Sequence, residues 1–152
     1  MSAEEPLVGE RLASFTVPSE EGNERLALTM LNQAMAGRGL DRACRDRLQT
    51  AVAEATMNAI EHGNHGDAAV PVEIEVFQAP SELLISISDL GGAEASARSE
   101  EPDLDRKLDG QQTPRGWGLF LIRNMVDDMR VITDGRRHTV WLTMRTARPP
   151  ES

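Results

Sequence analysis

Hydrophobic and polar residues alternate along the chain with two different periods, which predict both strands and helices. Residues 12–17 alternate with a period of two and end before Pro18, as a short first strand does. Ser19 follows in a position typical of a helix N-cap, and apolar residues over 26–35 predict a first helix that ends near Gly37. The chain therefore opens with a strand and a helix.

A second, longer helix is predicted from Asp41, as its N-cap, to the neighbourhood of Gly63. Its apolar residues recur at helical spacing, so that one stripe of the helix faces the core. This stripe consists of Leu48, Ala51, Val52, Ala55 and Ala59.

Two alternating runs follow, at 72–77 and 83–88, on either side of a turn sequence at 79–82. Their spacing predicts an antiparallel hairpin with an apolar inward face. The inward residues are Val72, Ile74, Val76, Leu83, Ile85 and Ile87.

The stretch 91–114 shows little periodicity, and so long a loop in a compact domain usually has a function. A third helix is predicted after Gly118, and a last pair of strands turns at Asp134 and Gly135. The core face of this third helix is expected to hold Leu119, Ile122, Val126 and Met129.

The order of these elements is strand, two helices, hairpin, loop, helix and hairpin, which predicts an α+β fold. We expect a two-layer α/β sandwich in which an antiparallel-rich mixed sheet carries its helices on one face. The domain is expected over residues 10–146, with flexible termini at 1–9 and 147–152.

Charge and cysteine content narrow the expected partners. The formal net charge of -9 argues against broad electrostatic capture of nucleic acid or anionic lipid. No apolar run approaches the roughly 20 residues that span a bilayer, and the acidic start of the chain is unlike a signal peptide. Cys44 stands alone, so an internal disulfide is excluded. We therefore expect a cytoplasmic protein without nucleic-acid or membrane partners.

Glu54 and Asn58 lie four residues apart on the second predicted helix and therefore share a face. Asn is a weak helix former, which makes its position within a helix informative. An amide oxygen suits Mg²⁺, and a carboxylate one turn away can accept a proton from a hydroxyl. The pair is either a metal and base site or an ordinary solvated helix face.

Asp89 has the same parity as the inward residues of its strand. A carboxylate at an inward position is unfavourable unless a donor satisfies it. Such a donor could be an amino group like that of adenine, and Gly91 and Gly92 would let backbone approach the ligand closely. The alternative is a turn-forming Asp at the end of a strand.

Gly116, Trp117 and Gly118 open the third predicted helix, directly after Arg115. Free amides and the positive end of the helix dipole favour phosphate at such a position. Arg115 would add a forked cationic donor. The alternative is a tight loop that leads into a helix, with Trp117 as packing.

The order of these three sites resembles the ATPase superfamily of gyrase, the Hsp90 chaperone, histidine kinases and MutL. Glu-Ala-Thr-Met-Asn-Ala-Ile-Glu-His-Gly at 54–63 resembles its N box, and Asp-Leu-Gly-Gly at 89–92 resembles its Asp-x-Gly-x-Gly box. The segment 115–128 resembles its second glycine box. Within this superfamily, the N box and Gly-Leu-Phe-Leu-Ile-Arg-Asn-Met-Val-Asp-Asp at 118–128 are most similar to the anti-sigma-factor serine/threonine kinases of bacterial partner-switching systems.

The resemblance implies a Bergerat-type fold that binds ATP and Mg²⁺ and phosphorylates a Ser or Thr of a partner. It implies that Asn58 ligates Mg²⁺, that Glu54 is the catalytic base and that Asp89 receives the adenine amino group. A lid over 93–114 is implied as well. The further cofactor-binding positions that it implies are His62, Gly91, Gly92, Arg115, Gly116, Trp117, Gly118 and Leu119.

Family members typically dimerise and bind either a sigma factor or an antagonist of the STAS type. The resemblance therefore implies a homodimer that acts on a STAS-domain antagonist and binds a sigma factor. Ala93 departs from the family pattern, because it occupies the position of the second glycine of the Asp-x-Gly-x-Gly box. The alternative function is a non-catalytic module that uses ATP to sequester a regulatory partner.

Overall fold

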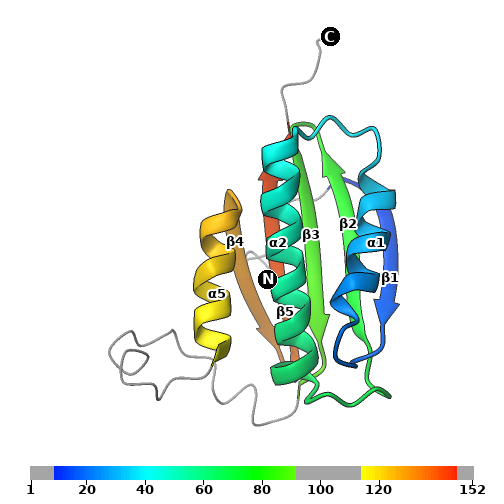
Figure 1. The fold of residues 1–152 in the computed structure, drawn as a ribbon, viewed down its shortest axis with the longest axis vertical. Coiled ribbons are helices and arrows are strands. Elements are labelled where there is room, and N and C mark those ends of the chain that lie inside the picture. Colours follow the sequence, from blue (N-terminus) through cyan, green and yellow to red (C-terminus); the bar gives the residue numbers. More distant parts are fainter. Residues whose placement is uncertain (1–8, 92–113, 147–152) are drawn as a thin grey trace.

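The computed structural model describes residues 9–91 and 114–146, which form one sheet with helices packed against it (Figure 1). The strands are β1 (Glu10–Val17), β2 (Val72–Ala79), β3 (Glu82–Asp89), β4 (Asp128–Asp134) and β5 (Arg137–Arg145). The helices are α1 (Glu24–Met35), α2 (Arg42–Asn58) and α5 (Pro114–Met125), and the π-helical turn η1 (Ala59–Gly63) continues α2.

The five strands lie in the order β1-β2-β3-β5-β4, which places β3 at the centre. Each pairing between neighbours is antiparallel. All three α-helices cover the same face of this sheet (Figure 1). The predicted two-layer α+β sandwich is therefore confirmed, and its sheet is antiparallel throughout the described residues rather than mixed.

The core lies between the sheet and α2, where the two predicted apolar faces meet. Every residue of the predicted α2 stripe is buried, as is every predicted inward residue of the β2–β3 hairpin. Burying each of these larger aliphatic side chains stabilises the fold by about 1.5–3 kcal/mol. None of the helices in the described ranges is long and apolar enough to cross a membrane.

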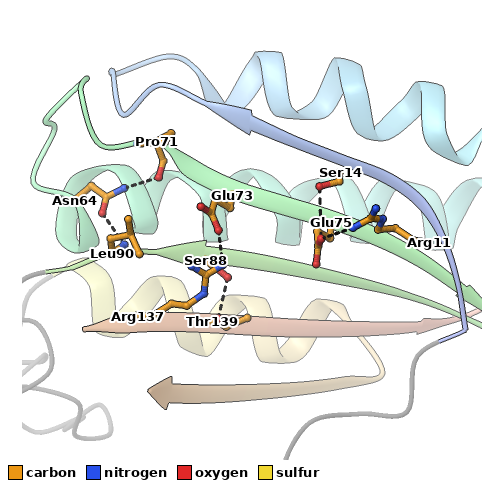
Figure 2. Close-up of polar contacts among 10 residues, drawn as sticks. All are labelled: Arg11, Ser14, Asn64, Pro71, Glu73, Glu75, Ser88, Leu90, Arg137 and Thr139. Carbon is orange, nitrogen blue, oxygen red and sulfur yellow. Dashed lines mark hydrogen bonds and ion pairs between the residues drawn. The ribbon is translucent and has the colours of Figure 1, made fainter. Parts of the chain in front are cut away.

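The other face of the sheet carries charged and hydroxyl side chains, as Figure 2 shows. Glu73 pairs with Arg137, and Ser88 and Thr139 share a hydrogen bond of 2.8 Å. Glu75 accepts a bond of 3.1 Å from Arg11. These residues alternate with the apolar core residues along the same strands, so the period of two in the sequence reflects a sheet with one helix-covered face.

Of the two predicted helix caps, one is confirmed and one is wrong. Asp41 caps α2 as expected, because its Oδ1 accepts a 2.8 Å bond from the amide of Cys44, and this bond lowers the pKa of the carboxyl group. The predicted cap at Ser19 is wrong, since α1 begins only at Glu24. The Ser19 hydroxyl instead donates to the carbonyl of Val70 at 2.5 Å, which ties the start of this connection to a distant loop.

The third helix starts earlier and ends earlier than expected. It begins at Pro114, a residue suited to the first helical position because its φ is already fixed. Met129 was expected on this helix but lies in β4, so that prediction is wrong. The reason is pairing with β5: the Asp127 amide donates to Thr143 O at 3.0 Å and takes the chain out of the helix.

Candidate functional site

The candidate site residues form two groups on the helix-covered side of the sheet. The first, the α2–α5 cluster, consists of Glu54, Asn58 and Gly118. A Cβ atom added at Gly118 would lie 2.8 Å from Asn58 Nδ2 and 2.8 Å from Glu54 Oε2. A glycine is therefore required for α5 to approach these two side chains so closely.

Asn58 is the least satisfied member of the α2–α5 cluster. Its side chain is buried, and within the described part of the chain Nδ2 has no hydrogen-bond partner. Buried polar atoms are nearly always paired, so an unpaired one calls for a ligand, an ion or water. Glu54, one turn earlier on α2, is half-buried and is therefore still reachable from outside.

The second group, the strand-end cluster, consists of Gly63, Asp89, Gly91 and His138. Asp89 ends β3 at an inward position and is only 4% exposed. Its Oδ1 accepts a 2.9 Å bond from the Gly91 amide and lies 3.3 Å from His138 Nδ1. A Cβ at Gly63 would lie 2.2 Å from Asp89 Cγ, so the end of η1 reaches the carboxylate only as glycine.

The π-helical turn η1 carries the chain from one cluster to the other. The Asn64 amide donates to Ala59 O at 2.8 Å, a bond that spans one residue more than an α-helical bond does. Such wide turns are rare and are found frequently at functional sites. Here the turn places Gly63 against Asp89 while Asn58, earlier on the same helical segment, stays beneath α5.

The buried side chain of Asn64 links three segments of the chain next to Asp89, and Figure 2 shows its bonds to two of them, at Pro71 and Leu90. Its Nδ2 donates to Pro71 O at 3.2 Å and to Ser19 Oγ at 3.0 Å. Its Oδ1 accepts a 2.9 Å bond from the amide of Leu90, the residue directly after Asp89. This network fixes the backbone on which the strand-end cluster depends.

Most predicted site residues of α2 and β3 fall into these two clusters. His62 lies outside them, on η1, where its half-buried ring has Nε2 3.9 Å from Glu61 Oε1. Gly92, Ala93 and nearly all of the predicted lid lie outside the described residues. At 115–117 the structure describes the backbone as part of α5 but not the side chains of Arg115 and Trp117.

The early start of α5 bears on the predicted phosphate contacts. Only the first few amides of an α-helix lack an intrahelical partner. Because α5 begins at Pro114, Gly116 lies among these free amides, whereas Gly118 and Leu119 lie beyond the first turn. Their predicted amide contacts therefore require the first turn of α5 to open, and they stay predictions.

A separate hollow of about 140 Å³ lies on the α1 side of α2, lined among others by Arg25, Met57 and Ile60. Ligand pockets usually enclose about 300–1,000 Å³, and this hollow includes no residue of either cluster. The candidate site therefore consists of the residues that the two clusters contribute from α2, η1, the end of β3, β5 and α5.

Comparisons with known proteins decide the family. Residues 17–144 match the family described as the histidine kinase-like ATPase domain. The chain belongs to this family. The anti-sigma F factor of Oceanobacillus iheyensis is 30% identical over 103 residues, which cover 66% of this chain and 69% of that protein. The resemblance to anti-sigma-factor kinases that the motifs indicated is thereby confirmed.

Two solved structures share the fold of the chain described here. The RsbU and RsbW domains of Rv1364c from Mycobacterium tuberculosis match 90% of this chain with a TM-score of 0.65 and 21% identity, and this chain spans 33% of that one. In the SiaB-SiaC complex from Pseudomonas aeruginosa, the matched chain gives a TM-score of 0.65 and 12% identity, with 89% and 90% of the two chains covered. The predicted Bergerat-type sandwich is confirmed.

Sequence reasoning missed His138 and Asn64. His138 carries the same signal that singled out Asp89, because it shares the inward parity of Val140 and Leu142 on its strand. Asn64 gave no comparable signal. Its partners lie in segments whose proximity depends on the folded sheet, so nothing local marks it.

Proposed function

We propose that this chain is an ATP-dependent protein serine/threonine kinase of a bacterial partner-switching system. Membership of an ATPase family implies that it binds ATP. The observation that carries the proposal is the α2–α5 cluster, in which Glu54 and Asn58 lie one turn apart beneath Gly118. This arrangement offers a carboxylate base and an amide ligand one turn into α5, a helix whose first free amides can receive phosphate.

The donor set supports a role for Mg²⁺. In the described ranges no group of three or more His, Cys, Asp or Glu side chains is placed to hold a metal ion. Mg²⁺ in nucleotide sites needs no such group, because one or two protein oxygens and the phosphates complete its shell. The side-chain oxygen of Asn58 would be the ligand, whereas its buried, unpaired Nδ2 is a donor and would bond to a phosphate oxygen. Bound there with ATP, Mg²⁺ would neutralise charge on the phosphates.

We assign the strand-end cluster to binding of the adenine ring of ATP. Asp89 would accept a hydrogen bond from the 6-amino group of adenine, with Gly91 shaping its surroundings. Its bond from the Gly91 amide holds the carboxylate in place for this contact. The remaining positions that we assign to nucleotide binding are His62, Gly92, Arg115, Gly116, Trp117, Gly118 and Leu119.

In the proposed transfer step Glu54 accepts the proton of a Ser or Thr hydroxyl. The hydroxyl oxygen forms a bond to the γ-phosphorus while the bond to the ADP oxygen breaks. Positioning and charge neutralisation contribute most to catalysis of this kind, and a general base contributes about 10²–10⁴-fold.

We propose a STAS-domain antagonist as the substrate, a sigma factor as a second partner, a homodimer as the assembly and the cytoplasm as the location. The similarity to an anti-sigma F factor supports a regulatory protein partner. The matched fold occurs in a protein solved as a complex, SiaB with SiaC, which also fits a partner-binding role.

The test is transfer of labelled phosphate from ATP to a STAS-domain partner. Glu54→Gln should keep ATP binding and lower the transfer rate by about 100-fold or more. Glu10→Gln is the matched control, because Glu10 is exposed on β1 outside both clusters and its loss should leave the rate unchanged. An ATP-dependent complex with no transfer by the unmodified protein would instead identify a non-catalytic sequestering module.

A further inference from the structure

The two edges of the sheet differ in how well they can accept another strand. At the β1 edge the register shifts between Arg11 and Ala13, an irregularity of the kind that protects an edge from further pairing. At the other edge, β4 pairs with β5 in continuous register and contains neither Pro nor Lys. Within residues 9–91 and 114–146 no strand lies on its outer side. The β4 edge is therefore regular and open to pairing.

The turn between β4 and β5 determines which backbone groups point outward at this edge. The turn has two residues, and Asp134 pairs with Arg137 at its base. The closing pair of such a hairpin is hydrogen-bonded, and bonded and non-bonded pairs alternate along an antiparallel ladder. The amide and carbonyl groups of Val131 and Thr133 therefore point away from β5, where a further strand can bond to them.

Exposed apolar side chains lie on both elements that form this edge of the molecule. Val131 is on the helix-covered side of the sheet, opposite Val140 of β5, and is nevertheless 47% exposed. Leu121 is 46% exposed on α5, the helix that lies next to β4 (Figure 1). A single exposed apolar side chain is ordinary, but apolar exposure at an open strand edge favours an interface.

The charges of β4 are self-complementary in one antiparallel register. When β4 faces β4 of a second copy with Ile132 opposite the partner's Ile132, Arg130 faces the partner's Asp134. The two-fold symmetry repeats this pair, with Asp134 facing the partner's Arg130. Val131 then faces the partner's Thr133, so the outward backbone groups meet as hydrogen-bonded pairs. Opposite charges that face each other across two strands stabilise their pairing.

Neighbouring registers lack this complementarity. Moving the second copy by two residues places like charges opposite each other, either Asp128 against the partner's Asp134 or Arg130 against the partner's Arg136. Like charges directly opposite destabilise a strand pair. The charge pattern therefore selects the register centred on Ile132.

We propose that β4 pairs antiparallel with β4 of a second copy of this chain, so that one sheet continues through both copies. This inference rests on the proposed function, because it names the interface of the homodimer proposed there. It does not require phosphoryl transfer, since none of its contacts involves Glu54 or Asn58.

The test is the dimer dissociation constant of the full chain, measured by sedimentation over a series of concentrations. Arg130→Asp and Asp134→Arg should each weaken the dimer by about tenfold, because each places like charges opposite each other twice. Combining both changes in one chain restores the pairing of opposite charges and should return the affinity to within about threefold of the unmodified protein. A double variant that dimerises no better than either single variant would overturn the proposal.

Arg11→Asp is the matched control. Arg11 is also an exposed arginine that pairs with a carboxylate, Glu75 at 3.1 Å, but it lies on β1 at the other edge. This change should leave the dissociation constant unchanged. Equal weakening by Arg11→Asp and Arg130→Asp would overturn the proposal, since the effect would not be specific to β4.

Amide hydrogen exchange gives a second readout on the unmodified protein, and it decides the matter if the charge variants do not fold. The amides of Val131 and Thr133 should exchange slowly in the dimer and rapidly after dilution to the monomer. The amide of Ile132 bonds to β5 and should stay protected in both states. Rapid exchange at Val131 and Thr133 in the dimer would overturn the proposal.

The outcomes also separate this inference from the proposed function. If the chain transfers phosphate but stays monomeric, the kinase stands and the β4 interface fails together with the homodimer. If the dimer persists unchanged in Arg130→Asp and Asp134→Arg, the homodimer stands and only the β4 interface fails. If the β4 dimer forms but ATP does not bind, the kinase fails and this interface stands.

Discussion

One helical segment, α2 with η1, contributes residues to both the strand-end cluster and the α2–α5 cluster. The polar atoms of the two clusters nevertheless differ in how many hydrogen bonds they make. Asp89 bonds to Gly91 and His138, and the adjacent Asn64 bonds to three other segments. Asn58, in contrast, buries an Nδ2 that lacks a partner in the described part of the chain. The strand-end cluster also keeps one buried atom, His138 Nε2, without a partner among the described residues. The fold therefore preorganises the Asp89 carboxylate, whereas the Asn58 amide leaves part of its hydrogen-bonding capacity to a ligand.

This difference predicts opposite consequences of mutation. Changes at the strand end should lower both stability and nucleotide affinity, because the same bonds serve both. Changes in the α2–α5 cluster should affect nucleotide binding more than stability. Four variants test the contrast, of which three have both a stability and a binding readout and the fourth has a stability readout.

The largest effect is expected for Gly63→Ala. The added Cβ would lie 2.2 Å from Asp89 Cγ, so the buried carboxylate must move away from Gly91 and His138. We expect the free energy of unfolding to fall by about 3 kcal/mol, measured by urea denaturation, together with a loss of ATP binding. Gly37→Ala is the control, because its Cβ meets nothing within 4 Å and only its positive φ is strained. A smaller effect at Gly63 than at Gly37 would contradict the close packing at Asp89.

Asn58→Ala should separate binding from stability. Affinity for Mg-ATP should fall by about 100-fold, as expected when a metal ligand is lost. The melting temperature should stay the same or rise, because Ala is the better helix former and an unpaired buried donor disappears. With the metal removed by EDTA, the difference in ATP affinity between the two proteins should shrink. A melting temperature lowered by several degrees would mean that Asn58 is mainly structural.

Asn64→Ala should lower the free energy of unfolding by about 2 kcal/mol, because the Leu90 amide and two loop carbonyls lose a buried partner. ATP affinity should also decrease several-fold, since Leu90 adjoins Asp89. The control is Asn124→Ala, whose exposed amide donates to Phe120 O, one turn earlier on α5, at 2.8 Å. That change should stay within about 0.5 kcal/mol of the parent protein.

The smallest effect is expected for Gly118→Ala. In an ordinary helix this substitution stabilises by about 0.5–1 kcal/mol. Here the Cβ would press against Asn58 Nδ2 and Glu54 Oε2 at 2.8 Å, so we expect a net destabilisation of about 1 kcal/mol. Calorimetric melting gives the sign directly. A stabilised variant would show that α2 and α5 separate without strain, and would remove the argument that glycine is needed there.

Much of the fold and part of the site could be predicted from local sequence patterns. The alternation at 72–88 gave the hairpin and the inward position of Asp89, because strand periodicity depends only on neighbouring residues. The cap at Asp41 was predictable for the same reason, since its partner amide at Cys44 lies within one turn. The order of the motifs also sufficed to identify the ATPase family.

Other features depended on partners that are distant in sequence. Ser19 has the local signal of a helix cap, but its hydroxyl bonds to Val70, 51 positions away. Met129 continues a helical spacing, but pairing with β5 placed it in a strand. The bond between His138 and Asp89 spans 49 positions. Sequence patterns determine which way a side chain faces along its own element, whereas only the packed sheet decides which side chains meet, because burial makes hydrogen-bonding groups compete for partners across the whole chain.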